Sequence, residues 1–192
     1  CFDDALDACR PAVWGDKPPL VLRGRAAWVL AARGDKPAAI AKMREILTAD
    51  RDYYWGWQQL AGWYDSPDTY NDYLEAGEQL VRLAPSDPTS YGYRGEAKLF
   101  LNDRRGAKQD FQKAFDLDPQ YVFAGLHLID EQLADNDLDG AKKTLARLQE
   151  HGDSPYVQLR SVRVAVKVGD ETQAREAFAE MCSDAETPVL LL

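Results

Sequence analysis

The sequence has few histidines and cysteines, two side chains that often act in catalysis and metal binding. Its 192 residues include two histidines, three cysteines and two methionines. His127 and His151 show no metal-binding spacing, and Cys1, Cys9 and Cys182 match neither a metal site nor a redox motif. No glycine-rich phosphate loop follows a strand pattern. We therefore expect no enzyme activity, no cofactor and no metal, although carboxylates from separate parts of the chain could still meet in space.

The chain is also short of positive charge and of long apolar runs. It has 23 Lys and Arg against 32 Asp and Glu, which gives a net charge of −9. Phosphate binding depends on clustered Lys and Arg, so we expect no nucleic-acid partner. No run approaches the roughly 18 apolar residues of a membrane helix, so we expect no membrane insertion. The chain opens on Cys1 without a signal-peptide pattern, which favours a cytoplasmic fragment of a larger protein; a removed signal would also fit.

What the sequence does contain is a helical pattern repeated at a fixed interval. Ala107, Phe111 and Ala114 fall on one face of a helix, at spacings of four and three residues. Alanines recur at the first of these positions with separations of 68, 34 and 33 residues: Ala39, Ala107, Ala141 and Ala174. A period of this size is typical of one helical hairpin copied along the chain. We therefore predict an all-α fold, an α–α superhelix or solenoid, in which each hairpin buries its apolar side against the next.

The period divides the chain into a half repeat, five repeats and a final segment. We predict a single solenoid over residues 1–192, with the half repeat at 1–14 and the repeats at 18–51, 52–85, 86–119, 120–153 and 154–185. Residues 186–192 are expected to begin a further helix or to form a cap. In the second repeat Tyr73 replaces the recurring alanine, and Gly77 replaces the bulky residue four positions later. We expect this exchange of large and small side chains to conserve the packed volume.

The repeated units resemble tetratricopeptide repeats. In the second unit the matching residues are Trp57, Leu60, Ala61, Tyr64 and Pro85, and in the third they are Tyr91, Gly95, Ala107, Phe111, Ala114 and Pro119. Small residues in this pattern let paired helices approach closely, while aromatic residues fill the space between hairpins. The resemblance covers nearly the whole chain. It implies a non-catalytic interaction module that holds a protein segment on the surface lined by its first helices.

The resemblance also implies which residues face the peptide-binding groove. They are Trp28, Trp55, Gln58, Asp65, Thr89, Glu96, Leu99, Phe100, Phe123, Leu126, Asp130, Tyr156 and Arg163. Three of them are acids spaced at close to one repeat, so we expect the groove to favour an apolar segment that carries Lys or Arg. Two alternatives stay open. Aromatic residues in such helices can instead form the core between repeats, and acids on a chain of net charge −9 need no binding role.

A second interpretation is a helical accessory or non-catalytic subunit of an enzyme. The segment from Trp55 to Leu60 is similar to the Trp-rich helical repeat of the protein prenyltransferase alpha subunit, although a single unit shows this pattern. An appendage within a larger multidomain bacterial protein is also open. The partner, the pathway and the oligomeric state do not follow from the sequence.

Overall fold

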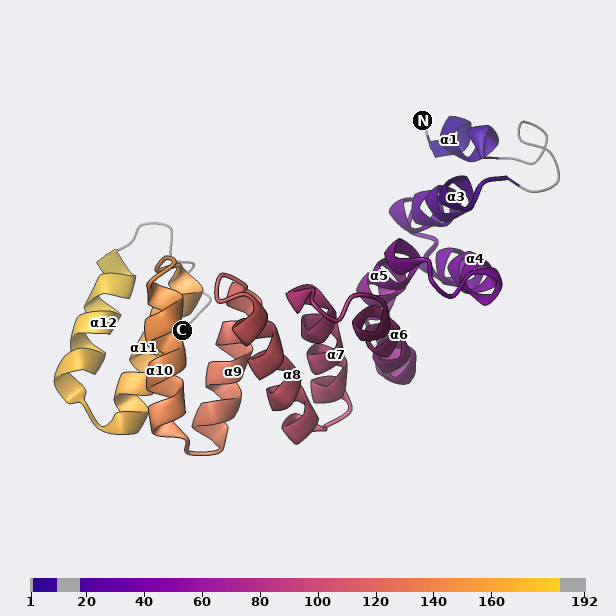
Figure 1. Cartoon of the computed structure of the whole chain (residues 1–192). Helices are drawn as coiled ribbons and strands as arrows, with labels where there is room; N and C mark the ends of the chain where they lie inside the picture. Colours follow the sequence, from indigo (N-terminus) through magenta and orange to yellow (C-terminus); the bar gives the residue numbers. More distant parts are fainter. Residues whose placement is uncertain (1, 10–17, 184–192) are drawn as a thin grey trace. The chain divides into compact units, whose positions relative to one another are not determined.

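The computed structural model describes residues 2–9 and 18–183 of the chain. Within these ranges there is no strand, and none of the helices is long and apolar enough to span a bilayer. The prediction of an all-α fold is therefore confirmed. The helices are α1 (Phe2–Ala8), α3 (Leu20–Ala32), α4 (Lys36–Ala49), α5 (Tyr54–Trp63), the short 3₁₀ helix η1 (Pro67–Thr69), α6 (Tyr70–Leu83), α7 (Pro88–Phe100), α8 (Arg104–Leu117), α9 (Val122–Ala134), α10 (Leu138–Gln149), α11 (Pro155–Val168) and α12 (Glu171–Ser183) (Figure 1).

The chain divides into two compact units. Unit 1 spans Cys1–Pro85 and holds α1 and the hairpins α3–α4 and α5–α6, whereas unit 2 spans Ser86–Leu192 and holds the hairpins α7–α8, α9–α10 and α11–α12. Within unit 2 the helices follow one another side by side in chain order (Figure 1). A single continuous solenoid stays a prediction. The predicted segments at 10–14 and 186–192 lie outside the described residues.

An aspartate closes the turn inside four of the hairpins by capping the second helix. The Asp103 carboxylate accepts a hydrogen bond from the backbone N–H of Gly106 at 2.9 Å, and Asp137 accepts one from Gly140 at 3.0 Å. Two further aspartates cap α4 and α12 in the same way: Asp35 and Asp170. A carboxylate at this place satisfies an N–H group that the first helical turn leaves unpaired, and it interacts favourably with the helix dipole. The capping aspartates therefore recur with the same period as the hairpins.

The α5–α6 hairpin differs from the others in both its turn and its packing. Ser66 and Thr69 exchange hydrogen bonds around η1, in place of the aspartate cap. Tyr73 is 3% exposed and Gly77 is buried, so a large ring fills the place that a small alanine occupies elsewhere. This is the exchange of large and small side chains expected from the sequence.

The core of unit 2 lies between successive hairpins. Phe111, Phe115 and Leu128 are fully buried there, and burial of each such side chain is worth about 1.5–3 kcal/mol. The recurring alanines Ala107 and Ala141 are fully buried as well, and their small size allows close helix contacts. These contacts hold the first helices of the three hairpins at fixed positions.

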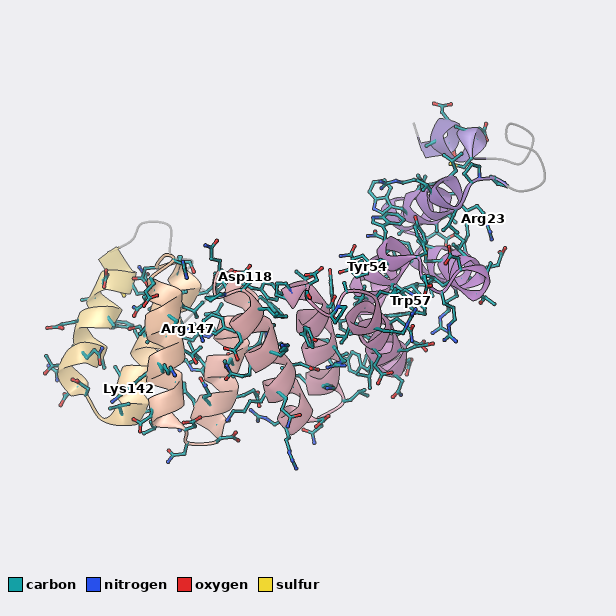
Figure 2. All side chains as sticks on the ribbon, in the orientation of Figure 1. Arg23, Tyr54, Trp57, Asp118, Lys142 and Arg147 are labelled. Atoms are coloured by element: carbon teal, nitrogen blue, oxygen red, sulfur yellow. The ribbon has the colours of Figure 1, made fainter. Side chains whose placement is uncertain are left out.

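Charged side chains reinforce the contacts between second helices. Arg147, which Figure 2 labels on α10, lies over the ring of Phe115 of α8 at 4.5 Å from the ring centroid. Its Nη1 atom also lies 3.3 Å from a carboxylate oxygen of Asp116. The cation is thus shared between an aromatic face and a carboxylate, and it links α8 to α10.

Candidate functional site

The first helices of the three hairpins in unit 2 present side chains at equivalent places. One row lies fourteen residues before the capping aspartates and contains Thr89, Phe123 and Tyr156. Another row lies seven residues before the same aspartates and contains Glu96, Asp130 and Arg163. We define the first-helix face as these residues together with Leu126, His127 and Arg160. It contains most of the predicted groove residues of unit 2.

A pocket of about 340 Å³ opens between α9 and α11 on this face. It is lined by Phe123, Leu126, His127, Tyr156 and Arg160. Phe123 and Leu126 are half-buried and pack against the core, whereas Tyr156 is 53% exposed. Three of the predicted groove residues therefore meet in one pocket. Its walls are mainly apolar with one cation, a composition that suits a single apolar side chain beside a polar group.

His127 forms part of the pocket wall through its ring contacts. Its imidazole stacks on Phe111 with the ring centroids 4.9 Å apart, and it lies 4.4 Å from the ring of Phe123. Burial lowers the pKa of His127, and this effect outweighs the opposing influence of Asp130 and Glu96. The imidazole is therefore neutral at neutral pH. It contributes an aromatic surface to the pocket without adding charge.

On the α7 side of the first-helix face, the carboxylates of Glu96 and Asp87 act on two tyrosines. Burial raises the pKa of Tyr93 and of Tyr121, and the charges of Glu96 and Asp87 raise both further. A carboxylate can act on these hydroxyls only where it is close and poorly screened. Glu96 thus places a carboxylate near both hydroxyls at this edge of the face.

On the α11 side of the first-helix face, Asp130 pairs with two arginines. Its carboxylate accepts hydrogen bonds from Arg160 at 2.7 Å and from Arg163 at 2.5 Å. Two guanidinium groups therefore surround one carboxylate. Two of the predicted groove residues, Asp130 and Arg163, are brought together, and the negative charge of Asp130 is compensated.

The remaining predicted residues of unit 2 have mixed positions. The Thr89 hydroxyl donates a hydrogen bond to Asp87 at 2.7 Å. Leu99 packs against the core of unit 2, whereas Phe100 is 45% exposed at the end of α7. Leu99 thus contributes to packing within unit 2.

The predicted residues of unit 1 lie on α3, on α5 and just beyond α5. Trp28 is 43% exposed on α3, and Trp55 and Gln58 are half-buried on α5. Asp65 follows α5 and pairs with Lys36 at the start of α4, with 2.5 Å between Nζ and the carboxylate oxygen. This pair is exposed, and the lysine lowers the pKa of Asp65.

Three residues with a place on these surfaces were missed from the sequence. Arg160 lies four residues after Tyr156, and His127 lies four residues after Phe123, so each shares a helix face with a predicted residue. Arg25 lies three residues before Trp28, and its guanidinium carbon lies 4.7 Å from the centroid of Trp55. Helical spacing alone could have found all three.

The described residues contain no cluster of three or more His, Cys, Asp or Glu side chains that could hold a metal ion.

No family model matches the sequence, and no curated protein matches it. Solved structures do match its fold. MamA superposes with a TM-score of 0.76 at 18% identity, over 85% of this chain and 90% of MamA. PilF of Pseudomonas aeruginosa superposes with a TM-score of 0.76 at 16% identity, over 98% of this chain and 95% of PilF.

YrrB, a tetratricopeptide-repeat protein with an unusual peptide-binding site, superposes with a TM-score of 0.74 at 16% identity, over 95% of this chain and 96% of YrrB. The chain has the tetratricopeptide-repeat fold. The resemblance recognised from the recurring alanines is thus confirmed at the level of the fold. In these tetratricopeptide-repeat hairpins, α7, α9 and α11 are the first helices, and the pocket lies between two of them.

Proposed function

We propose that this chain is a non-catalytic interaction module whose first-helix face in unit 2 binds a segment of a partner protein. The observation that carries the proposal is the pocket between α9 and α11, where exposed Tyr156 stands beside half-buried Phe123 and Leu126. Aromatic and aliphatic anchors seated in such pockets supply most of the binding energy of interfaces. An apolar side chain of the partner occupies this pocket.

We propose further that the segment carries a Lys or Arg near its apolar anchor. Glu96 supports this choice because its charge acts on the tyrosines and on His127 around it. Asp130 contributes less, since two arginines already compensate its carboxylate. The basic residue of the partner is therefore directed toward α7. Complementary charge of this kind governs specificity and association rate more than affinity.

Fluorescence anisotropy with labelled peptides tests this function. The probes are three peptides with one central Leu-Phe anchor, flanked by Lys in the first, by Gln in the second and by Glu in the third. We expect the Lys peptide to bind most tightly. Tyr156→Ala should weaken its binding about tenfold because it removes an exposed anchor, and Glu96→Gln should reduce its advantage over the Gln peptide.

The matched control is Phe178→Ala. Phe178 is 43% exposed on α12, a second helix, so its removal deletes an exposed aromatic side chain away from the pocket. Binding by this variant should equal that of the unaltered chain. Equal affinity for the Lys and Glu peptides, or unchanged binding after Tyr156→Ala, would contradict the proposal.

A further inference from the structure

Unit 1 carries a second exposed surface on its own first helices. We define the Trp28 surface as Arg25 and Trp28 of α3 together with Trp55 and Gly62 of α5. One period of 34 residues separates Trp28 from Gly62, so the two occupy equivalent places on adjacent first helices. α3 and α5 contact each other within unit 1. Trp28 is 43% exposed, and Val21, seven residues earlier on α3, is 58% exposed.

Arg25 differs from the other described arginines of unit 1 in its partner. Those arginines each lie within 4.0 Å of a carboxylate: Arg23, Arg33, Arg44, Arg51 and Arg82. Among the described residues Arg25 has no such carboxylate, and its guanidinium lies over the ring of Trp55. A guanidinium that lies over an aromatic ring still has N–H groups that can donate to an anion. Arg25 is exposed on a chain of net charge −9, and within residues 2–9 and 18–183 no carboxylate lies within 4.0 Å of its guanidinium.

At Gly62 the backbone of α5 is exposed on the same surface. A Cβ atom added at Gly62 would meet nothing within 4 Å, and the residue does not have a positive φ. Neither packing nor backbone conformation therefore requires glycine here, although glycine lowers helix stability relative to alanine. Gly24 on α3 is different, because a Cβ there would lie 3.1 Å from the ring of Trp55. Gly62 thus leaves open space where a partner's backbone can approach closely.

We propose that the Trp28 surface binds an acidic segment of a partner protein. A carboxylate of that segment pairs with Arg25, an apolar side chain lies against Trp28, and the main chain passes over Gly62. Acidic character follows from charge complementarity, because Arg25 is the described cation of this surface and no carboxylate of the described residues neutralises it. The ligand is therefore opposite in charge to the one proposed for unit 2, and the two proposals are independent.

Selection from a phage library of random dodecapeptides, panned on the full chain, tests this inference. Each enriched peptide is then synthesised and its Kd measured on the unaltered chain, on Arg25→Gln and on Gly62→Met. We expect one class of enriched peptides to contain Asp or Glu beside an aromatic or aliphatic residue. Their binding should weaken about tenfold on either variant, the typical effect of losing a charge-assisted contact or of blocking close approach.

Two kinds of control distinguish loss of binding at the Trp28 surface from unfolding and from effects in unit 2. Gly62→Met places a better helix former in open space, so its melting temperature should not fall. Arg105→Gln removes the same charge from an exposed position of α8 and should leave binding unchanged, as should Glu96→Gln. The inference is overturned if no enriched peptide depends on Arg25 and Gly62, or if the dependent peptides are basic.

Discussion

Arg94 of α7 holds the buried carboxylate of Asp110 of α8 with two hydrogen bonds, of 2.8 and 2.6 Å. Lys98 adds a third contact at 2.7 Å, and Asp110 is only 3% exposed. A carboxylate is tolerated at such a depth when it is paired and hydrogen-bonded. This ion cluster joins the two helices of the hairpin that carries Glu96, so it helps to position the first-helix face.

Asp110→Asn should lower the free energy of unfolding by about 3 kcal/mol, because it leaves two cations beside a neutral group in a nearly closed site. Urea denaturation measures the change. The control is Glu171→Gln, which breaks an ion pair with Arg175 whose side chains are both 78% exposed. That pair is screened by water, so the urea midpoint should hardly move. Equal effects of the two substitutions would show that burial of Asp110 does not matter.

Gly92 and Gly62 should respond in opposite directions to alanine. A Cβ at Gly92 would lie 3.0 Å from the Cζ atom of Tyr121 and 2.9 Å from its Cε1 atom. Gly92→Ala should therefore destabilise the chain by about 1–3 kcal/mol, as overpacking does. Gly62→Ala should stabilise it by about 0.5–1 kcal/mol, since open space surrounds that position. Thermal unfolding of both variants measures the change in stability. A change of the same sign in both would contradict either the close contact at Gly92 or the open space at Gly62.

Stability should fall as the pH drops below about 6.5, and His127 should account for part of the loss. Burial among aromatic rings lowers its pKa from the ordinary value of 6.5, an effect that Asp130 and Glu96 oppose and Arg160 assists. The unfolded chain then binds more protons than the folded chain in the window between the folded pKa and 6.5. The stabilisation is complete above 6.5 and is lost on acidification, with a slope of at most about 1.4 kcal/mol per pH unit.

NMR titration of the His127 ring protons gives the folded pKa directly, and His127→Gln should flatten the decline in stability between pH 6.5 and pH 5. A folded pKa at or above 6.5 would contradict the burial of this imidazole.

The fold was predictable because it depends on a local pattern repeated many times. The spacing between Ala107 and Ala141, and the small residues at both places, follow directly from the sequence, and both side chains are fully buried. The α5–α6 hairpin broke the pattern, yet Tyr73 is buried as the exchange with Gly77 requires. Helical periodicity and turn chemistry thus carry most of the information about an array of this kind.

The surface was less predictable because its charge depends on contacts between helices. The sequence places Asp130 and Arg163 on first helices, but it does not show that Arg160 and Arg163 both turn toward Asp130. The same limit explains why the contact between the Arg25 guanidinium and the Trp55 ring was missed. Side-chain direction across neighbouring hairpins, rather than the position of a residue on its own helix, decides which charges remain available to a partner.

NMR of the full chain, titrated with the Lys-flanked peptide to saturation, tests the central claim most directly. We predict that the amide signals of Leu126, Tyr156 and Glu96 shift, because the first two residues line the pocket and Glu96 carries the carboxylate proposed to meet the basic residue of the peptide. Signals from the second helices, such as that of Lys142, which Figure 2 labels on α10, should stay in place. Shifts confined to second helices, or no shift at a saturating concentration, would contradict a binding site on the first-helix face.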